Sequence, residues 1–141
     1  MKKWGSVLLT MVLMVSMFLM VASADTTSGV SGDISWTMDN GVLTISGTGV
    51  LGPDVMLTVG ASNIKQVVIQ PGVTGIGEQA LYGCSQLTDI QIPDSVTSIG
   101  GMAFADCSKL ASIALPDSLD TLKDMVYMRC ESLTAIRTPV G

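Results

Sequence analysis

The feature that most constrains the fold is a repeat of 23 residues in the second half of the chain. Cys84, Cys107 and Cys130 lie 23 residues apart, and apolar residues recur in register around each of them. The aligned columns are Leu87, Leu110 and Leu133; Ile76, Ile99 and Leu122; Ala80, Ala103 and Val126; Leu81, Phe104 and Tyr127; and Ile90, Ile113 and Ile136. A fixed period of about 20 to 30 residues with apolar positions locked to it is typical of a solenoid, in which short coils stack.

Each copy of the repeat predicts the same order of elements. In the second copy, 87–92 predicts a strand, 93–95 a proline-containing turn, 96–99 a short second strand and 102–107 one or two helical turns. No coil can bury its own apolar side chains, so the coils must stack at roughly the 4.8 Å spacing of paired strands. The sequence therefore predicts three coils over 65–136, built from short parallel strands and brief helical turns. Residues 137–141 begin an incomplete fourth copy.

The first 24 residues have the pattern of a signal peptide. Lys2 and Lys3 precede an apolar run over 7–20, and Ala22-Ser23-Ala24 supplies the small residues at which a signal peptidase cleaves. An uncleaved anchor is the alternative, because about 20 apolar residues can span a bilayer. Cleavage would remove two lysines and leave 12 acidic and 5 basic residues, a net charge of −7. We therefore expect a secreted or cell-surface protein that is unsuited to binding nucleic acid or anionic lipid.

The segment between the leader and the repeats predicts two further parts. Residues 25–32 have no periodicity, which favours a flexible leader. Residues 33–64 predict a β-rich N-terminal cap, because two strand-like runs flank Asn40-Gly41, a dipeptide suited to the positive φ angles of a hairpin turn. Within this cap, 55–59 favours a further strand. Such a cap would cover the open apolar end of the first coil.

The string from Leu87 to Cys107 resembles the coil of the BspA-type leucine-rich repeat family of exported and cell-surface proteins. The coils of that family read Leu-x-x-Ile-x-Ile-Pro-x-x-Val-x-x-Ile-Gly-x-x-Ala-Phe-x-x-Cys, and the hairpin over 36–49 is similar to a module that often precedes them. This chain departs from the pattern at Gln70-Pro71, which shifts the proline, and at Lys123-Asp124, which replaces the glycine pair. The resemblance covers about 33–136. It implies a leucine-rich repeat solenoid that serves as an adhesin or surface interaction protein, without enzymatic chemistry in the repeat.

Residues that could carry catalysis or bind a metal are few. The chain has no histidine, which removes a Cys/His zinc site and the usual general base of a serine or cysteine triad. Asp94 and Asp117 recur at one turn position, where a carboxylate bonds nearby backbone N–H groups. Cys84, Cys107 and Cys130 predict buried structural thiols, because three is an odd number and stacked side chains point in parallel. The sequence therefore predicts a protein that is not an enzyme and needs no metal or cofactor.

The remaining candidate site is the outward face of the stacked strands. Two outward columns are expected: Gln66, Asp89, Ser112 and Ala135 in one, and Val68, Gln91, Ala114 and Arg137 in the other. Their polar members, Gln66, Asp89, Gln91, Ser112 and Arg137, are the candidate binding residues, since solenoids bind partners along such faces. The expected partner is a protein or glycoprotein at a cell surface or in the extracellular matrix. The alternative is a non-binding spacer or a fragment of a longer array, able to self-associate edge to edge through an uncovered last coil.

Overall fold

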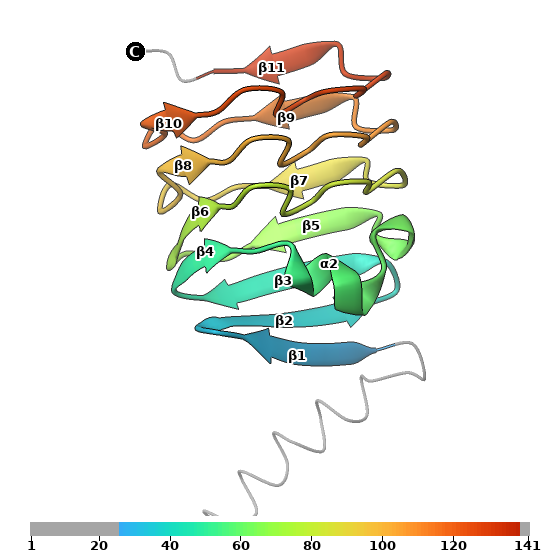
Figure 1. The fold of residues 1–141 in the computed structure, drawn as a ribbon, viewed down its shortest axis with the longest axis vertical. Helices are drawn as coiled ribbons and strands as arrows, with labels where there is room; N and C mark the ends of the chain where they lie inside the picture. The colour runs from blue at the N-terminus through green and yellow to red at the C-terminus, as the bar shows by residue number, and fades with distance from the viewer. Residues whose placement is uncertain (1–25, 139–141) are drawn as a thin grey trace, which may run out of the picture.

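The 23-residue copies stack as the coils of a β-solenoid in a computed structural model that describes residues 26–138 (Figure 1). One side of the coils carries the strands β5 (Gln66–Ile69), β7 (Asp89–Gln91), β9 (Ser112–Ala114) and β11 (Ala135–Arg137). A second side carries β4 (Gly49–Leu51), β6 (Val73–Ile76), β8 (Ser98–Ile99) and β10 (Thr121–Leu122). Strands that neighbour each other along each side run parallel wherever they pair. The predicted solenoid of short parallel strands is confirmed.

The third side of each coil consists of turns, so the helical turns expected at 102–107 are absent. Met102 and Asp106 have φ angles of 57° and 62°, in the left-handed region that interrupts an α-helix. The same conformation recurs one period away, at Gln79 and Met125 for the first position and at Gly83 and Arg129 for the second. Comparing the copies of the repeat could not reveal these left-handed positions, because five of the six residues are not glycine.

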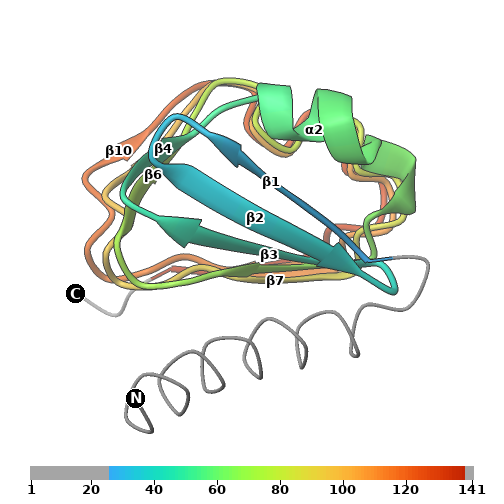
Figure 2. The ribbon, with the colours of Figure 1, turned by 90° about the horizontal axis from the view of Figure 1, so that it is seen from below.

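The N-terminal hairpin is already part of the solenoid. The strands β2 (Ile34–Asp39) and β3 (Val42–Gly47) pair antiparallel around Asn40 and Gly41, whose φ angles of 48° and 85° confirm the predicted tight turn. β3 then pairs in parallel with β5, and β4 pairs in parallel with β6. The helix α2 (Asp54–Val59) and the 3-10 helix η1 (Ala61–Asn63) stand where later coils have turns. Viewed from below, β2 runs across the end of the coils (Figure 2).

Two expectations for the N-terminal region are wrong. The flexible leader expected at 25–32 is replaced by β1 (Thr27–Ser31), which pairs antiparallel with β2 along its whole length. This close pairing depends on Gly29, because a Cβ there would lie 2.5 Å from the Trp36 ring. The strand expected at 55–59 is the helix α2. Its residues Val55, Met56 and Val59 are buried at helical spacing, which an alternating strand would not achieve.

The core consists of the apolar columns predicted from the repeat. Within the described residues every buried side chain is hydrophobic, and Phe104 is the largest fully buried one. Its ring stacks on Tyr127 of the next coil, with centroids 6.0 Å apart and an interplanar angle of 5°. Two of the columns are open at their last member: Ile113 is 2% exposed and Ile136 is 44% exposed, and Ile99 is 0% exposed and Leu122 is 46% exposed.

Hydroxyl and thiol side chains tie each coil to the one before it. Ser95 and Ser118 donate to the backbone carbonyls of Val73 and Val96, at 2.7 and 2.8 Å. Thr88, Thr97, Ser108 and Thr134 each donate to the carbonyl 23 residues earlier. At Lys65, Thr74 and Ala111 the same carbonyl also accepts the backbone N–H of the threonine, so there the hydroxyl adds a second bond between neighbouring coils. Serine and threonine at fixed repeat positions are therefore structural.

The predicted signal peptide, residues 1–24, lies outside the described residues. Between Thr26 and Thr138, no helix is both long and apolar enough to cross a membrane.

Candidate functional site: the outward face of the long sheet

The strand registers place the predicted binding residues on one face. Gln66 lies beside Asp89, and Val68 beside Gln91, across β5 and β7. Ala135 lies beside Ser112, and Arg137 beside Ala114, across β9 and β11. The intervening residues Val67, Ile90 and Ile113 are buried, so the named side chains point away from the core. Asp89, Gln91, Ser112 and Arg137 are exposed, and Gln66 is partly exposed.

These residues form two groups instead of one continuous array. In the described chain the long sheet runs β1-β2-β3-β5-β7, whereas β9 pairs only with β11. Gln66, Asp89 and Gln91 lie on the first group of strands, where Gln66 Nε2 donates to Asp89 Oδ2 at 3.3 Å. Ser112 and Arg137 lie on the second group, where the Leu115 N–H donates to the Arg137 carbonyl at 2.8 Å. The face thus offers a paired acid–amide group and, farther along, a single exposed cation.

The face extends into the N-terminal hairpin, which sequence analysis missed. The column of Gln66 continues through Val42 to Asp39, and the column of Val68 continues through Thr44 to Thr37. The alternation of polar and apolar residues in the hairpin was a sufficient signal for which side chains point outward. What the sequence did not show was that β3 pairs in parallel with the first coil.

A second surface cluster, Tyr82, Asp106 and Arg129, spans three coils on the turn side of the solenoid. Arg129 binds Asp106 through Nε–Oδ1 and Nη2–Oδ2 distances of 2.7 and 2.9 Å. Arg129 Nη2 also lies 3.4 Å from the Tyr82 hydroxyl. A hydrogen bond from Tyr82 to Asp106, and then the Asp106 charge, raise the pKa of the Tyr82 phenol. The fully buried Ala105 occupies the column between Tyr82 and Met128.

The cysteines are free thiols stacked inside the solenoid. Cys84 and Cys107 are buried, and Cys130 is partly buried. Cys107 Sγ donates to the Leu81 carbonyl at 3.4 Å, and Cys130 Sγ donates to the Phe104 carbonyl at 3.0 Å. The neighbouring Cys84 thiol and burial raise the pKa of Cys107, and burial raises the pKa of Cys130. The raised pKa values oppose thiolate formation at Cys107 and Cys130, and the thiolate is the form that acts as a nucleophile or metal ligand.

The aspartates do not gather into a metal centre. Within residues 26–138, no three histidine, cysteine, aspartate or glutamate side chains lie close enough to hold an ion. The chain as a whole has no histidine. Asp94 and Asp117 remain exposed residues of the turns that follow the long-side strands.

Solved structures share the fold. A leucine-rich repeat protein from Bacteroides capillosus is 18% identical with a TM-score of 0.58, covering 79% of this chain and 98% of that one. A leucine-rich repeat protein from Eubacterium ventriosum is 24% identical with a TM-score of 0.55, covering 82% of this chain. This chain spans only 44% of the Eubacterium protein. No curated protein matches.

The family assignment comes from the sequence pattern of the coils. The pattern described as "BspA type Leucine rich repeat region (6 copies)" matches residues 59–141, more than half of the chain. This match begins in the last residue of α2 and includes β5 to β11. The chain therefore belongs to the BspA-type leucine-rich repeat family.

Proposed function

We propose that the protein is an exported, non-enzymatic interaction module that binds a protein or glycoprotein partner through the outward face of the stacked strands β5, β7, β9 and β11. The observation that carries this proposal is the open polar face itself. Asp89, Gln91 and Ser112 stand exposed on strands whose inward residues, Ile90 and Ile113, are buried in the core, and Arg137 stands exposed on the last strand, β11. A rigid face of this kind keeps its side chains in place before binding, which lowers the entropic cost of association.

The chemistry of the face favours a polar partner surface. Its columns contain hydroxyls, amides, two carboxylates and one guanidinium, with alanine and valine between them. Hydroxyl and amide side chains can form hydrogen bonds with the backbone amides of a protein or the hydroxyls of a sugar, either directly or through bridging water. The Arg137 guanidinium supplies the kind of anchor that frequently dominates interface energy.

Export and the absence of catalysis are part of the proposal. Export is supported by the leader pattern at residues 1–24 and by membership of a family of surface proteins. A non-enzymatic role is supported by the missing histidines and by the raised pKa values of Cys107 and Cys130, which leave few groups able to transfer protons at neutral pH.

The test is a binding screen of the purified protein against extracellular matrix proteins and cell-surface glycoproteins, followed by alanine substitution. Asp89→Ala, Gln91→Ala and Arg137→Ala in one chain should weaken binding at least about tenfold, since truncating interface anchors commonly costs more than 1.4 kcal/mol. The matched control combines Asp124→Ala, Gln86→Ala and Lys109→Ala, which change the same kinds of charge away from the face. Equal affinity of both variants for a bound partner would refute the sheet face as the site. If no member of the screen binds, the spacer role takes its place.

A further inference from the structure

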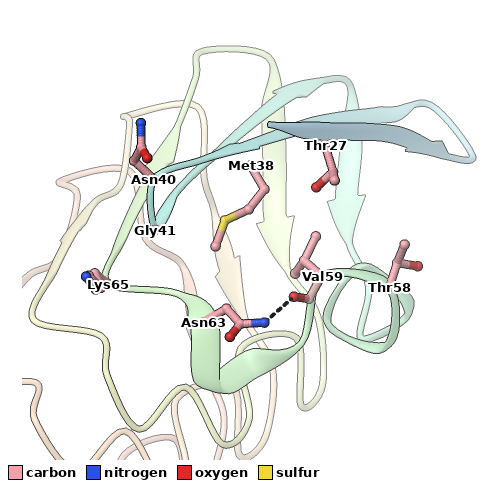
Figure 3. A pocket seen from close by; sticks show the side chains of 8 residues that line it. All are labelled: Thr27, Met38, Asn40, Gly41, Thr58, Val59, Asn63 and Lys65. Carbon is pink, nitrogen blue, oxygen red and sulfur yellow. Dashed lines mark hydrogen bonds between the residues drawn. The ribbon is translucent and has the colours of Figure 1, made fainter. Parts of the chain in front are cut away.

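The N-terminal end of the solenoid contains a pocket that the repeat pattern does not account for. It has a volume of about 420 Å³ and lies between the β1–β2 pair and the helices α2 and η1 (Figure 3). Met38 and Val59, both nearly buried, form its apolar part. Thr27, Asn40, Asn63 and Lys65 supply polar side chains around it.

The pocket exists because β1 presents small and polar residues to the core side. Thr27, Gly29 and Ser31 lie opposite the inward residues Met38, Trp36 and Ile34 of β2. Beside Gly29 the space is filled by the Trp36 ring, and at Ser31 it is closed by a hydrogen bond from the serine hydroxyl to Asp54 at the start of α2. Beside Thr27 the space stays open and forms the pocket, which Val59 also lines. The strand that closes the solenoid thus leaves one hollow with a hydroxyl at its edge.

The amides around the pocket are held in place and retain free bonding capacity. Asn63 Nδ2 donates to the Val59 carbonyl at 3.1 Å, and among residues 26–138 the side-chain Oδ1 of Asn63 accepts no hydrogen bond. Asn40 Nδ2 donates to Asp39 Oδ1 at 3.0 Å, so its carbonyl oxygen is likewise available. In the described part of the chain the Thr27 hydroxyl makes no hydrogen bond and can donate or accept. A ligand matching this set must carry several hydrogen-bond donors for the two amide oxygens and can also accept from Thr27, and sugar hydroxyls meet both requirements.

The charge at the pocket gives an anionic ligand little advantage. Lys65 is the single charged residue among the lining side chains, and its aliphatic stem lies against Gly41, where a Cβ would sit 3.0 Å from Lys65 Cδ. The Asp39 carboxylate, held by Thr26 and Asn40 at 3.0 Å each, belongs to the outward column and lies on the opposite face of β2 from Met38. Lys65 is exposed, so water screens its charge, and an anion would give up its own hydration for little attraction.

We propose that this pocket binds one uncharged sugar unit, with its hydroxyls on Thr27, Asn40 and Asn63 and its C–H face on Met38 and Val59. A volume of about 420 Å³ is at the small end of ligand pockets, which run from about 300 to 1,000 Å³. It suits a monosaccharide or the end of a glycan and is too small for a longer chain. This site lies on the inner side of β1 and β2 and is independent of the outward face.

The test uses the purified ¹⁵N-labelled protein and the methyl glycosides of glucose, galactose and N-acetylglucosamine as probes. We expect saturable amide shifts at Gly41 and Gly60, which flank the pocket, for at least one probe at millimolar concentration. Thr27→Ile fills the pocket while suiting a strand, and Asn40→Gly removes one amide while keeping the positive φ of the turn. Each should weaken binding at least about tenfold, which is 1.4 kcal/mol. A titration with a soluble oligosaccharide of the best sugar distinguishes a glycan end from a free monosaccharide.

The matched control is Thr37→Ile, the same change on the outward face of the adjacent strand β2, which should leave sugar binding unchanged. The triple alanine variant of the sheet face should also bind sugar normally, so failure of one site leaves the other testable. The proposal is overturned if none of the three glycosides gives saturable shifts, or if Thr27→Ile and Asn40→Gly bind as the wild type does. It is equally overturned if acetate or hexanoate occupies the pocket more tightly than the sugars.

Discussion

Tyr127 carries the one buried side-chain oxygen or nitrogen that lacks a hydrogen-bond partner among the described residues. It occupies the column in which the preceding coil has Phe104, and the two rings stack. The Tyr127 ring is therefore well packed, while its hydroxyl is removed from water without gaining a hydrogen bond. A buried polar group left unpaired costs about 1–3 kcal/mol. Tyr127→Phe should thus raise the free energy of unfolding, by about 1 kcal/mol, although most substitutions in a core lower it.

A second signature of the same hydroxyl appears at high pH. Burial, and then the nearby Cys130, raise the pKa of Tyr127 from 10.0 to about 12. Between these values the unfolded chain releases the phenolic proton and the folded chain retains it, so wild-type stability falls as pH rises above about 10. The loss can reach about 1.4 kcal/mol for each pH unit in that window. The phenylalanine variant lacks this loss, so its advantage should widen from pH 10 towards pH 12.

The assay is urea unfolding of both proteins at pH 7 and at intervals above pH 9, followed by circular dichroism. The slope of free energy against urea should be unchanged, since the surface exposed on unfolding is the same. At pH 7 Tyr82→Phe is the control, because that phenol is exposed and its removal should change stability little. A Tyr127→Phe variant that is less stable than the wild type at pH 7 would show that the hydroxyl has a partner in solution, and the reasoning would be refuted.

Three further predictions follow from individual contacts. The Ser95 hydroxyl accepts from the Gly72 N–H at 3.2 Å and donates to the Val73 carbonyl, whereas the Ser118 hydroxyl makes one bond, to Val96. In urea unfolding, Ser95→Ala should therefore lower the free energy of unfolding by about 2 kcal/mol and Ser118→Ala by about 1 kcal/mol. Equal losses would contradict this. In the native protein Cys107 should resist alkylation by iodoacetamide while the partly exposed Cys130 reacts first, as read by mass spectrometry of the digested protein. The pKa of Cys107 is raised in the folded protein, so above about pH 8.5 the unfolded chain releases the thiol proton while the folded chain retains it. The free energy of unfolding should therefore fall as pH rises above about 8.5, and Cys107→Ala should make this fall less steep. Gly83→Ala should cost about 1–2 kcal/mol in thermal unfolding through its φ of 75° alone, since an added Cβ there meets no atom within 4 Å; an undiminished melting temperature would refute this.

The sequence was sufficient to predict the solenoid because the repeated residues are apolar side chains that a single coil cannot bury. Leu87, Leu110 and Ile99 are each fully buried, and only stacking of identical coils can bury them. The Asn-Gly turn was predictable for a different reason, since two positive φ angles in succession limit the residues that fit. In both cases a local pattern and the tertiary structure agree.

What could not be predicted depends on contacts between segments of different kinds. Thr27–Ser31 has the composition of a leader and becomes a strand because β2 offers a free edge and Gly29 leaves room for Trp36. Val55 to Val59 has strand-forming residues and becomes a helix because Val55, Met56 and Val59 must face the same apolar end of the core. The candidate pocket depends on both of these segments, so no repeat-based argument could have found it.

The positions at which the coils differ distinguish this chain from other proteins built of the same coils, whereas the repeated apolar columns do not. A column such as Val67, Ile90 and Ile113 repeats because every coil needs the same packing, and that need is met in any protein built this way. By contrast, the column of Tyr82, Ala105 and Met128 changes at each coil, and the column of Gly83, Asp106 and Arg129 does as well. Their combination forms a tyrosine–carboxylate–guanidinium contact that no coil could make alone. Specific recognition by a repeat protein therefore has to be sought where the period fails, and in this chain that means the Tyr82 cluster, the paired residues of the sheet face and the hollow beside Thr27.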